Sequence, residues 1–366
     1  MVYRVIGLMS GSSLDGLDIA YVHLQETGGK WSFDLLRTAC YPYSDSWKNR
    51  LRDSVHLSAE QYQLLHTDFG HYMGGEVNLF IGENNLLYQV QLLGSHGHTS
   101  FHLPSLKMTA QLGDGAALAA STGINVVSDL RSMDIALGGQ GAPIVPIGEK
   151  LLFPEHSLFL NIGGIANLSS FQGDRPVGFD VCPANRVLDL LSARAGQPYD
   201  EFGRMAAGGK VDALLLEKLQ SLEYYQMPPP KSLANSFGTD IIFPLIQRAG
   251  CSDRDALRTY TEHIVMQVKK SALDLAGSRL SGGPASMLVT GGGAFNQFLM
   301  DRLREVFHDT GIDPVLPEEN IISYKEALIM ALMGVLRWRE ENNVLCSVTG
   351  ASRNSIGGAV WMGQEA

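Results

Sequence analysis

Two carboxylates and several small polar residues lie between two apolar runs near the amino terminus. The sequence Ile-Gly-Leu-Met-Ser-Gly-Ser-Ser-Leu-Asp-Gly-Leu-Asp begins at residue 6. Backbone N–H groups and hydroxyls in such a turn can bind phosphate oxygens, with glycine allowing close approach, and the aspartates can bind Mg²⁺ directly or through water. The same residues are also ordinary turn formers, so the segment alone leaves both interpretations open. The candidate phosphate-binding residues are Gly11, Ser12, Ser13, Leu14, Asp15, Gly16, Leu17 and Asp18, with Asp15 as the candidate Mg²⁺ ligand.

Two further glycine-containing turns follow predicted strands. Asn-Ile-Gly-Gly-Ile-Ala-Asn at 161–167 contains Gly163 and Gly164, and Thr-Gly-Gly-Gly-Ala-Phe-Asn at 290–296 contains Gly291, Gly292 and Gly293. A glycine turn before a helix amino terminus can admit a phosphate, ribose or base. Each turn alone is a weak signal, but three at such positions form a much rarer pattern.

The elements that must position these turns repeat along the chain. Residues 2–24 and 31–43 predict three antiparallel strands, and residues 157–171 and 175–181 predict three more about 150 residues later. Each group is followed by alternating helices and strands, with helices expected at 59–81, 112–123, 255–277 and 296–309. The sequence therefore predicts a divergent duplication with two α/β lobes, one formed by residues 1–127 and 345–366 and the other by residues 128–344.

Composition excludes several classes of protein. Lys and Arg number 28 against 38 Asp and Glu among 366 residues, a formal charge of −10 that disfavours nucleic acid as a partner. The four cysteines are scattered without a CxxC pair, which is atypical of zinc or disulfide frameworks. No signal-peptide or membrane-spanning pattern is found, so we expect a cytoplasmic protein without membrane contact.

These motifs resemble the actin, sugar-kinase and Hsp70 superfamily and, more narrowly, anhydro-N-acetylmuramic acid kinases. The resemblance covers nearly the whole chain, with the sequences GLMSGSSLDGLD, GSHGHTSFHLP, QLGDGAALA, VVSDLRSMDIALGGQGAPIVP, NIGGIANL, GFDVCPAN, TGGGAFNQFLM and KEALIMALM in the family's order. It implies two ribonuclease H-like lobes with an active-site cleft between them. Implied ligands are ATP, Mg²⁺ and an anhydro-amino-sugar; whether the chain forms a homodimer is left open.

The resemblance also implies the reaction. Water and ATP convert 1,6-anhydro-N-acetylmuramic acid to N-acetylmuramic acid 6-phosphate and ADP, a step of peptidoglycan recycling. Asp180, in Gly-Phe-Asp-Val-Cys-Pro, matches the base that activates the water. A lone aspartate after a strand is more often structural, but the motif position favours catalysis.

Further polar positions match residues that face the sugar in the family. They are Arg131, Asp134 and Glu326, and His98 is a further candidate for sugar binding although it departs from the family's residue. The alternatives are a local ion pair for Arg131 with Asp134 and a carboxylate favoured by the helix dipole for Glu326. Gln is usual where His98 stands, and Thr-Gly is usual where Val181 and Cys182 stand.

Two other functions remain open at this point. A conventional amino-sugar kinase would use Asp180 to deprotonate a hydroxyl without cleaving a ring. A nucleotide-dependent binding module of the actin or Hsp70 type would use ATP to drive lobe motion. The Pro-rich segment 226–240 is expected to be a loop that can act as a flap.

Overall fold

The fold is that of a computed structural model, which describes residues 1–171, 176–229, 231–234, 236–276 and 285–363. The chain forms two compact units, Met1–Pro154 with Tyr324–Ala366 (unit 1) and Glu155–Ser323 (unit 2). These divisions differ from the predicted ones at 127/128 and 344/345. Residues 128–154 pack within unit 1 rather than in the second lobe. Most of the long helix at 319–338 also packs within unit 1.

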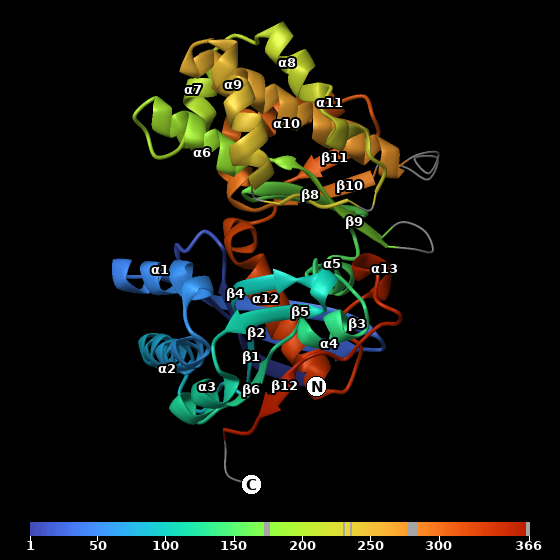
Figure 1. The fold of residues 1–366 in the computed structure, drawn as a ribbon. Coiled ribbons are helices and arrows are strands. Elements are labelled where there is room, and N and C mark those ends of the chain that lie inside the picture. Colours follow the sequence, from blue (N-terminus) through green and yellow to red (C-terminus); the bar gives the residue numbers. More distant parts are fainter. Residues whose placement is uncertain (172–175, 230, 235, 277–284, 364–366) are drawn as a thin grey trace. The chain divides into compact units, whose positions relative to one another are not determined.

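The sheet of unit 1 has the strand order β12-β6-β4-β1-β2-β3 (Figure 1). Its first three strands form an antiparallel meander, whereas β4 runs parallel to β1 and β6 parallel to β4. At the far edge β12 pairs antiparallel with β6, and β5 forms a hairpin with β4. The strands are β1 (Val2–Ser10), β2 (Gly16–Thr27), β3 (Lys30–Pro42), β4 (Leu92–Leu103), β5 (Met108–Leu112), β6 (Asn125–Ser128) and β12 (Ala359–Trp361).

Helices cover both faces of this sheet. On one face, Ile6 and Leu8 share a buried cluster with Phe69 and Met73 of α2, because alternate strand residues point to the same side. Gly7, between them, faces α12 on the opposite side. The helical segments are α1 (Asp45–Arg52), η1 (Asp53–His56), α2 (Ala59–Glu83), η2 (Pro104–Leu106), α3 (Gly115–Thr122), α4 (Ser132–Ala136), α5 (Pro146–Leu152), α12 (Glu319–Trp338) and α13 (Cys346–Thr349).

Side-chain caps define where several of these helices begin. Ser58 accepts a hydrogen bond from the backbone of Gln61, whose side chain in turn accepts from the Ser58 backbone, so α2 begins with a complete capping box. Asp114 caps α3 by accepting from the backbone N–H of Ala116 at 2.8 Å.

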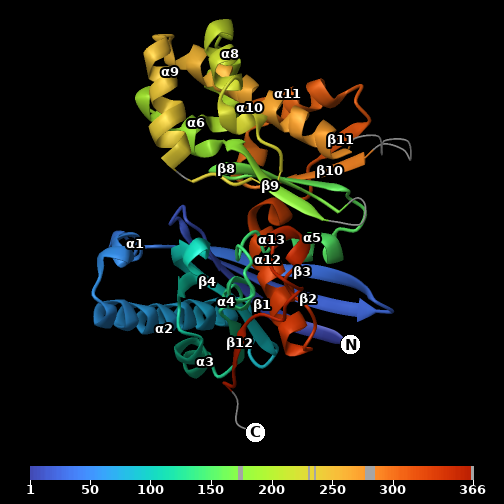
Figure 2. The same ribbon diagram turned by 45° about the vertical axis from the view of Figure 1, so that its right-hand side comes forward.

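The sheet of unit 2 has the order β11-β10-β7-β8-β9, the same arrangement as β6-β4-β1-β2-β3 (Figure 2). Here too the first three strands form an antiparallel meander, and β10 runs parallel to β7 and β11 parallel to β10. This repeated topology confirms the predicted fold class, two duplicated α/β lobes. The strands are β7 (Leu158–Ile162), β8 (Ile165–Ser170), β9 (Val177–Pro183), β10 (Ala285–Thr290) and β11 (Ile312–Val315).

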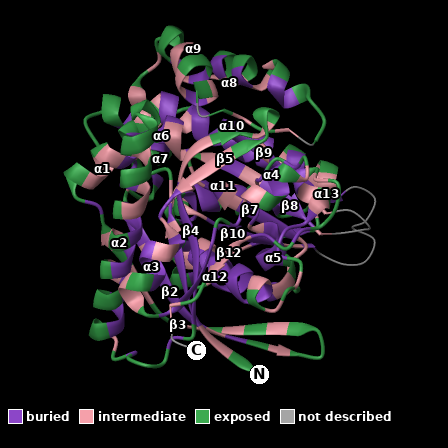
Figure 3. Cartoon of the chain, turned by 60° about the horizontal axis from the view of Figure 1, so that its bottom comes forward, coloured by how far each residue is buried: buried purple, intermediate pink, exposed green. Residues whose placement is uncertain are grey.

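A central helix and several shorter ones build the rest of unit 2. Helix α10 is largely buried and packs on β8 and β9 (Figure 3). The helical segments are α6 (Asn185–Arg194), η3 (Glu201–Gly203), α7 (Arg204–Ala207), α8 (Ala213–Gln220), η4 (Glu223–Gln226), η5 (Phe237–Ile242), α9 (Phe243–Ala249), α10 (Asp253–Ala276), η7 (Gly292–Phe295) and α11 (Gln297–Phe307). The predicted loop 226–240 therefore ends in helix, at Phe237. Within the described ranges, no helix is long and apolar enough to cross a membrane.

Glycine is required where α12 crosses the sheet of unit 1. A Cβ atom on Gly7 would lie 1.8 Å from the carbonyl oxygen of Ala327, and one on Gly94 would lie 2.2 Å from that of Met330. Both contacts are with backbone, which cannot rotate away as a side chain can. The helix can approach the strands this closely only because both positions lack a side chain.

We expect Gly94→Ala to lower the free energy of unfolding of unit 1 by more than about 2 kcal/mol, because α12 must move away from β4. Gly75→Ala is the matched control, since a Cβ at this exposed position of α2 meets no atom within 4 Å. The control should be neutral or stabilising by up to about 1 kcal/mol. Urea unfolding measures both, and equal stabilities for the two variants would contradict the close-approach argument.

Candidate functional site

The turn between β1 and β2 leaves its amino-terminal half open. Ser12 and Ser13 are exposed, and a Cβ on Gly11 would meet no neighbour other than Ser13 Oγ, at 3.5 Å. Leu14 has a positive φ of 60°, and its N–H donates to the carbonyl of Gly11 at 3.3 Å, which closes the turn. The N–H groups and hydroxyls of residues 11–13 are thus accessible to a ligand.

The second half of the same segment serves packing. A Cβ on Gly16 would lie 2.5 Å from the carbonyl oxygen of Tyr41 on β3, so glycine is required there by the protein itself. The side chain of Leu17 is fully buried in the core. Neither residue has a feature that points to a ligand, and their predicted phosphate contacts remain predictions.

Asp18 lies on β2 in a partly buried, acidic environment. Burial raises the pKa of its carboxyl to about 6, and the nearby carboxylates of Glu326 and Asp15 add to the rise. The thiol of Cys40, its partner on β3, hydrogen-bonds the Asp18 carboxylate and opposes the shift. A cation at this place would be favoured, because it would neutralise carboxylates that the protein only partly compensates.

These acidic groups are of the ligand type that Mg²⁺ prefers. Among residues the structure describes, no three His, Cys, Asp or Glu side chains are grouped as a protein-only metal site. Mg²⁺ in nucleotide sites is typically held by one or two carboxylates together with phosphate oxygens and water. Asp15, which is exposed, and Asp18 fit that pattern.

Helix α12 places Glu326 near Asp18. The neighbouring Lys325 forms a buried ion pair with Glu149 of α5, with 2.8 Å between Nζ and Oε1, which fixes this turn of α12 within unit 1. Burial raises the pKa of Glu326, whereas the positive charges of Lys325 and Arg131 lower it. In the described part of the chain no hydrogen-bond donor holds the Glu326 carboxylate, so it is available to a ligand.

Arg131 is held by His96 through an oriented imidazole. Arg131 Nε donates to His96 Nε2 at 2.9 Å, and His96 Nδ1 donates to the carbonyl of Gly97 at 2.8 Å. Burial, helped by the Arg131 charge, lowers the pKa of His96 to about 3, so the ring is neutral with its proton on Nδ1. Arg131 Nη1 donates to the carbonyl of Gly141 at 2.9 Å, which leaves Nη2 for a ligand.

The side chains of Asp134 and His98 form hydrogen bonds within unit 1. Asp134 is buried, and its two carboxylate oxygens accept from the Gly141 N–H at 2.8 Å and from the Thr349 hydroxyl at 2.7 Å. It therefore holds the loop that bears the Arg131 acceptor. His98 Nδ1 lies 3.1 Å from Ser10 Oγ, and burial lowers its pKa to about 4. Contacts of Asp134 and His98 with a sugar remain predictions.

In unit 2 the glycine turns lie together at one end of β7. A Cβ on Gly291 would lie 2.5 Å from Asn161 Oδ1 and one on Gly293 2.3 Å from Ile162 Cγ2, so both glycines pack against β7. By contrast, Gly292 leaves space, with its nearest neighbour, Asn185 Nδ2, at 3.5 Å. Added Cβ atoms on Gly163 and Gly164 would likewise find nothing closer than 3.5 Å and 3.8 Å. Three of the five predicted glycines are thus open.

Asp180 lies on β9, half exposed, with its neighbours Phe179 and Val181 in the core. The Leu233 N–H donates to Asp180 Oδ2 at 2.8 Å. Burial raises the pKa of Asp180, and this hydrogen bond opposes the rise. No described group donates to Oδ1, so this oxygen can accept a proton.

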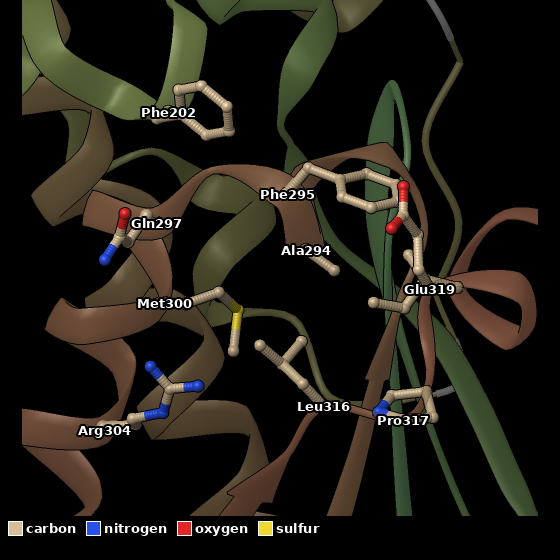
Figure 4. A pocket seen from close by; sticks show the side chains of 10 residues that line it. Phe202, Ala294, Phe295, Gln297, Met300, Arg304, Leu316, Pro317 and Glu319 are labelled. Carbon is tan, nitrogen blue, oxygen red and sulfur yellow. The ribbon is translucent and has the colours of Figure 1, made fainter.

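A pocket of about 510 Å³ opens beside the Gly291–Gly293 turn. The motif TGGGAFNQFLM contributes four of its lining residues, and the others lie outside that motif. Figure 4 shows the rings of Phe202 and Phe295 on one side and Met300, Leu316 and Pro317 on the other. Its polar lining is Gln297, Arg304 and Glu319. The lining residues come from η3, η7, α11, the segment between β11 and α12, and the start of α12, so no short motif contains all of them. The volume and the aromatic lining suit a flat small-molecule group.

The family model of anhydro-N-acetylmuramic acid kinase matches residues 3–363. The chain belongs to the anhydro-N-acetylmuramic acid kinase family. This match confirms the resemblance and, with it, the predicted activity: an ATP-dependent kinase that opens and phosphorylates the anhydro-sugar in peptidoglycan recycling.

Three solved structures are more distantly similar. The 2-hydroxyisocaproyl-CoA dehydratase activator from Clostridium difficile with bound ADPNP is 13% identical over 93% of this chain and 96% of that one, with a TM-score of 0.43. (R)-2-hydroxyglutaryl-CoA dehydratase component A from Acidaminococcus fermentans is 13% identical over 91% and 97%, with a TM-score of 0.45. A Listeria monocytogenes protein provisionally described as an N-acetylmannosamine kinase is 15% identical over 90% and 98%, with a TM-score of 0.37. The assignment rests on the family match.

We expect ¹⁵N NMR of histidine-labelled protein to find His96 neutral from pH 5 to 9, with its proton on Nδ1. The reason is that its pKa lies near 3 and that a carbonyl and a guanidinium fix the tautomer. His96→Phe identifies the signal. A titration midpoint near the ordinary value of about 6.5, or a proton on Nε2, would show that the ring does not accept from Arg131.

Proposed function

We propose that Asp180 is the base that activates water for attack on the anomeric carbon of 1,6-anhydro-N-acetylmuramic acid. Three features of its environment support this role: a half-exposed carboxylate, one oxygen held by Leu233, and the other oxygen without a described donor. The raised pKa makes the carboxylate a stronger base than an ordinary exposed aspartate. An inverting glycosidase uses a carboxylate in the same way.

The leaving oxygen needs no protein acid in this scheme. As the water oxygen bonds to C1, the C1–O6 bond breaks, and O6 bonds to the γ-phosphorus of ATP while the bond from that phosphorus to ADP breaks. The proton of the water passes to Asp180 Oδ1 and then to solvent. Cleavage and phosphorylation are coupled because the phosphoryl group takes the charge that forms on O6.

Each unit, taken by itself, has a turn that we propose for nucleotide phosphates. The open N–H groups and hydroxyls of Gly11, Ser12 and Ser13 suit phosphate oxygens, and Gly292 permits close approach in unit 2. Asp15 and Asp18 would hold Mg²⁺, which shields the charge of the transferred phosphoryl group when bound. The adjacent pocket is proposed for the base, between Phe202 and Phe295 (Figure 4).

The sugar is proposed to contact unit 1. Arg131 Nη2 can bind the lactyl carboxylate, because Nε and Nη1 are already used inside the protein and fix the guanidinium plane. Glu326 can accept a sugar hydroxyl, and His98 can offer its free ring nitrogen where Gln is usual. We assign Asp134 an indirect part in binding, through Gly141. We also infer a cytoplasmic location, where ATP is supplied.

We expect Asp180→Asn to bind ATP with nearly unchanged affinity while kcat falls by more than about 10³-fold, because the amide cannot take the proton from water. Calorimetry measures binding and ³¹P NMR measures formation of the sugar phosphate. Asp240→Asn, an exposed carboxylate of η5, is the matched control and should retain full activity. An Asp180→Asn variant that keeps a tenth of the wild-type rate would rule out Asp180 as the base.

We expect Phe295→Ala to weaken ATP binding by about tenfold, because one aromatic face of the pocket is lost. The KM for the anhydro-sugar should change little. Tyr199→Ala, which removes an exposed aromatic ring outside the pocket in the same unit, serves as the control. Unchanged ATP affinity in Phe295→Ala would place the base elsewhere.

A further inference from the structure

The segment 231–233 covers the free edge of the unit 2 sheet beside Asp180. Strand β9 is the last strand of the sheet, so one row of its backbone groups faces away from β8. The Asp180 N–H donates to the carbonyl of Lys231 at 3.1 Å, and the Leu233 N–H donates to Asp180 Oδ2 at 2.8 Å. The segment 231–233 thus forms hydrogen bonds with both the backbone N–H and the side-chain carboxylate of Asp180.

The segment is itself anchored through Tyr224. Lys231 Nζ donates to the carbonyl of Tyr224 at 3.1 Å and lies 4.7 Å from the centre of the Tyr224 ring. The Tyr224 hydroxyl donates to the carbonyl of Asp180 at 2.6 Å. Asp180, Lys231 and Tyr224 therefore form a closed ring of contacts that restrains the strand, the segment and the η4 helix together.

We propose that residues 231–233, anchored by Tyr224, are positioning residues that hold the Asp180 carboxylate through the Leu233 N–H and turn Oδ1 toward the attacking water. This inference rests on the proposed role of Asp180. The segment 231–233 belongs to the Pro-rich region to which the sequence assigned no chemistry. Its contribution comes from one backbone donor, which side-chain motifs do not reveal.

The groups around Asp180 leave the Leu233 N–H as the main stabiliser of its charge. Burial raises the pKa values of Cys182 on β9 and of Tyr224, so both are neutral at pH 7. Asn167, opposite Asp180 on β8, is uncharged, and the Lys231 ammonium is directed to Tyr224. The Leu233 N–H is the only described donor to the carboxylate, and its removal must raise the pKa of Asp180.

Titration of Asp180 tests the inference. We would record ¹³C NMR of carboxyl-labelled aspartate in the wild type, in Leu233→Pro, which lacks the N–H, and in Leu233→Ala, which keeps it. Asp180→Asn identifies the signal. The midpoint should rise by about one pH unit in Leu233→Pro and stay within a few tenths of a unit of the wild type in Leu233→Ala. Equal midpoints in the two variants would overturn the proposal.

The pH dependence of kcat should shift in the same direction as the pKa of Asp180. The reaction needs ionised Asp180, so kcat falls as the pH drops through its pKa, and a higher pKa moves this acid limb to higher pH in Leu233→Pro. The titration itself requires no turnover. A wild type that ignores the anhydro-sugar would therefore contradict the proposed function, whereas the titration would still decide whether Leu233 holds Asp180.

Hydrogen exchange provides a second test if Leu233→Pro fails to fold. The Leu233 amide should exchange at least about tenfold faster in Asp180→Ala, which lacks an acceptor, than in Asp180→Asn, which retains a carbonyl oxygen. Exchange at equal rates in these two variants would show that the side chain of Asp180 does not hold the segment, and would overturn the proposal.

Discussion

Burying a carboxylate costs free energy, and the candidate site in each unit depends on how that cost is offset. In unit 2 a single backbone N–H, that of Leu233, offsets the burial of Asp180. In unit 1 the charges of Lys325 and Arg131 act on Glu326, while Asp18 receives only a thiol hydrogen bond. In each case the partners offset the cost of burying the charge only in part. A proton, a cation or a sugar hydroxyl can therefore stabilise the carboxylate further.

The scaffold that brings these groups into place is built from close backbone contacts. In unit 1, the glycines of β1 and β4 let α12 lie directly on the sheet, and the buried pair of Lys325 with Glu149 fixes the turn that bears Glu326. In unit 2, Gly291 and Gly293 allow the turn after β10 to pack on β7. Gly292 between them stays open. Packing and ligand access are therefore divided among neighbouring residues of one motif.

The sequence predicted the parts of the molecule that local patterns encode. Alternating apolar residues and glycine turns identified both meanders, and their recurrence identified the duplication. Local patterns do not show that a Cβ on Gly16 would clash with β3, nor that Asp134 would be used by Gly141 and Thr349. The pocket and the support of Asp180 join residues that lie 50 to 120 positions apart, so the folded chain was needed to find them.

The most direct test of coupled cleavage and phosphorylation is mass spectrometry of the product formed in ¹⁸O-labelled water. The purified protein would be incubated with Mg-ATP and 1,6-anhydro-N-acetylmuramic acid, and the position of the label determined by fragmentation. A product that has gained one phosphate and one water, with the label on the anomeric oxygen, is the predicted result. A phosphorylated sugar with its anhydro ring intact, or a label in the phosphate, would contradict the account.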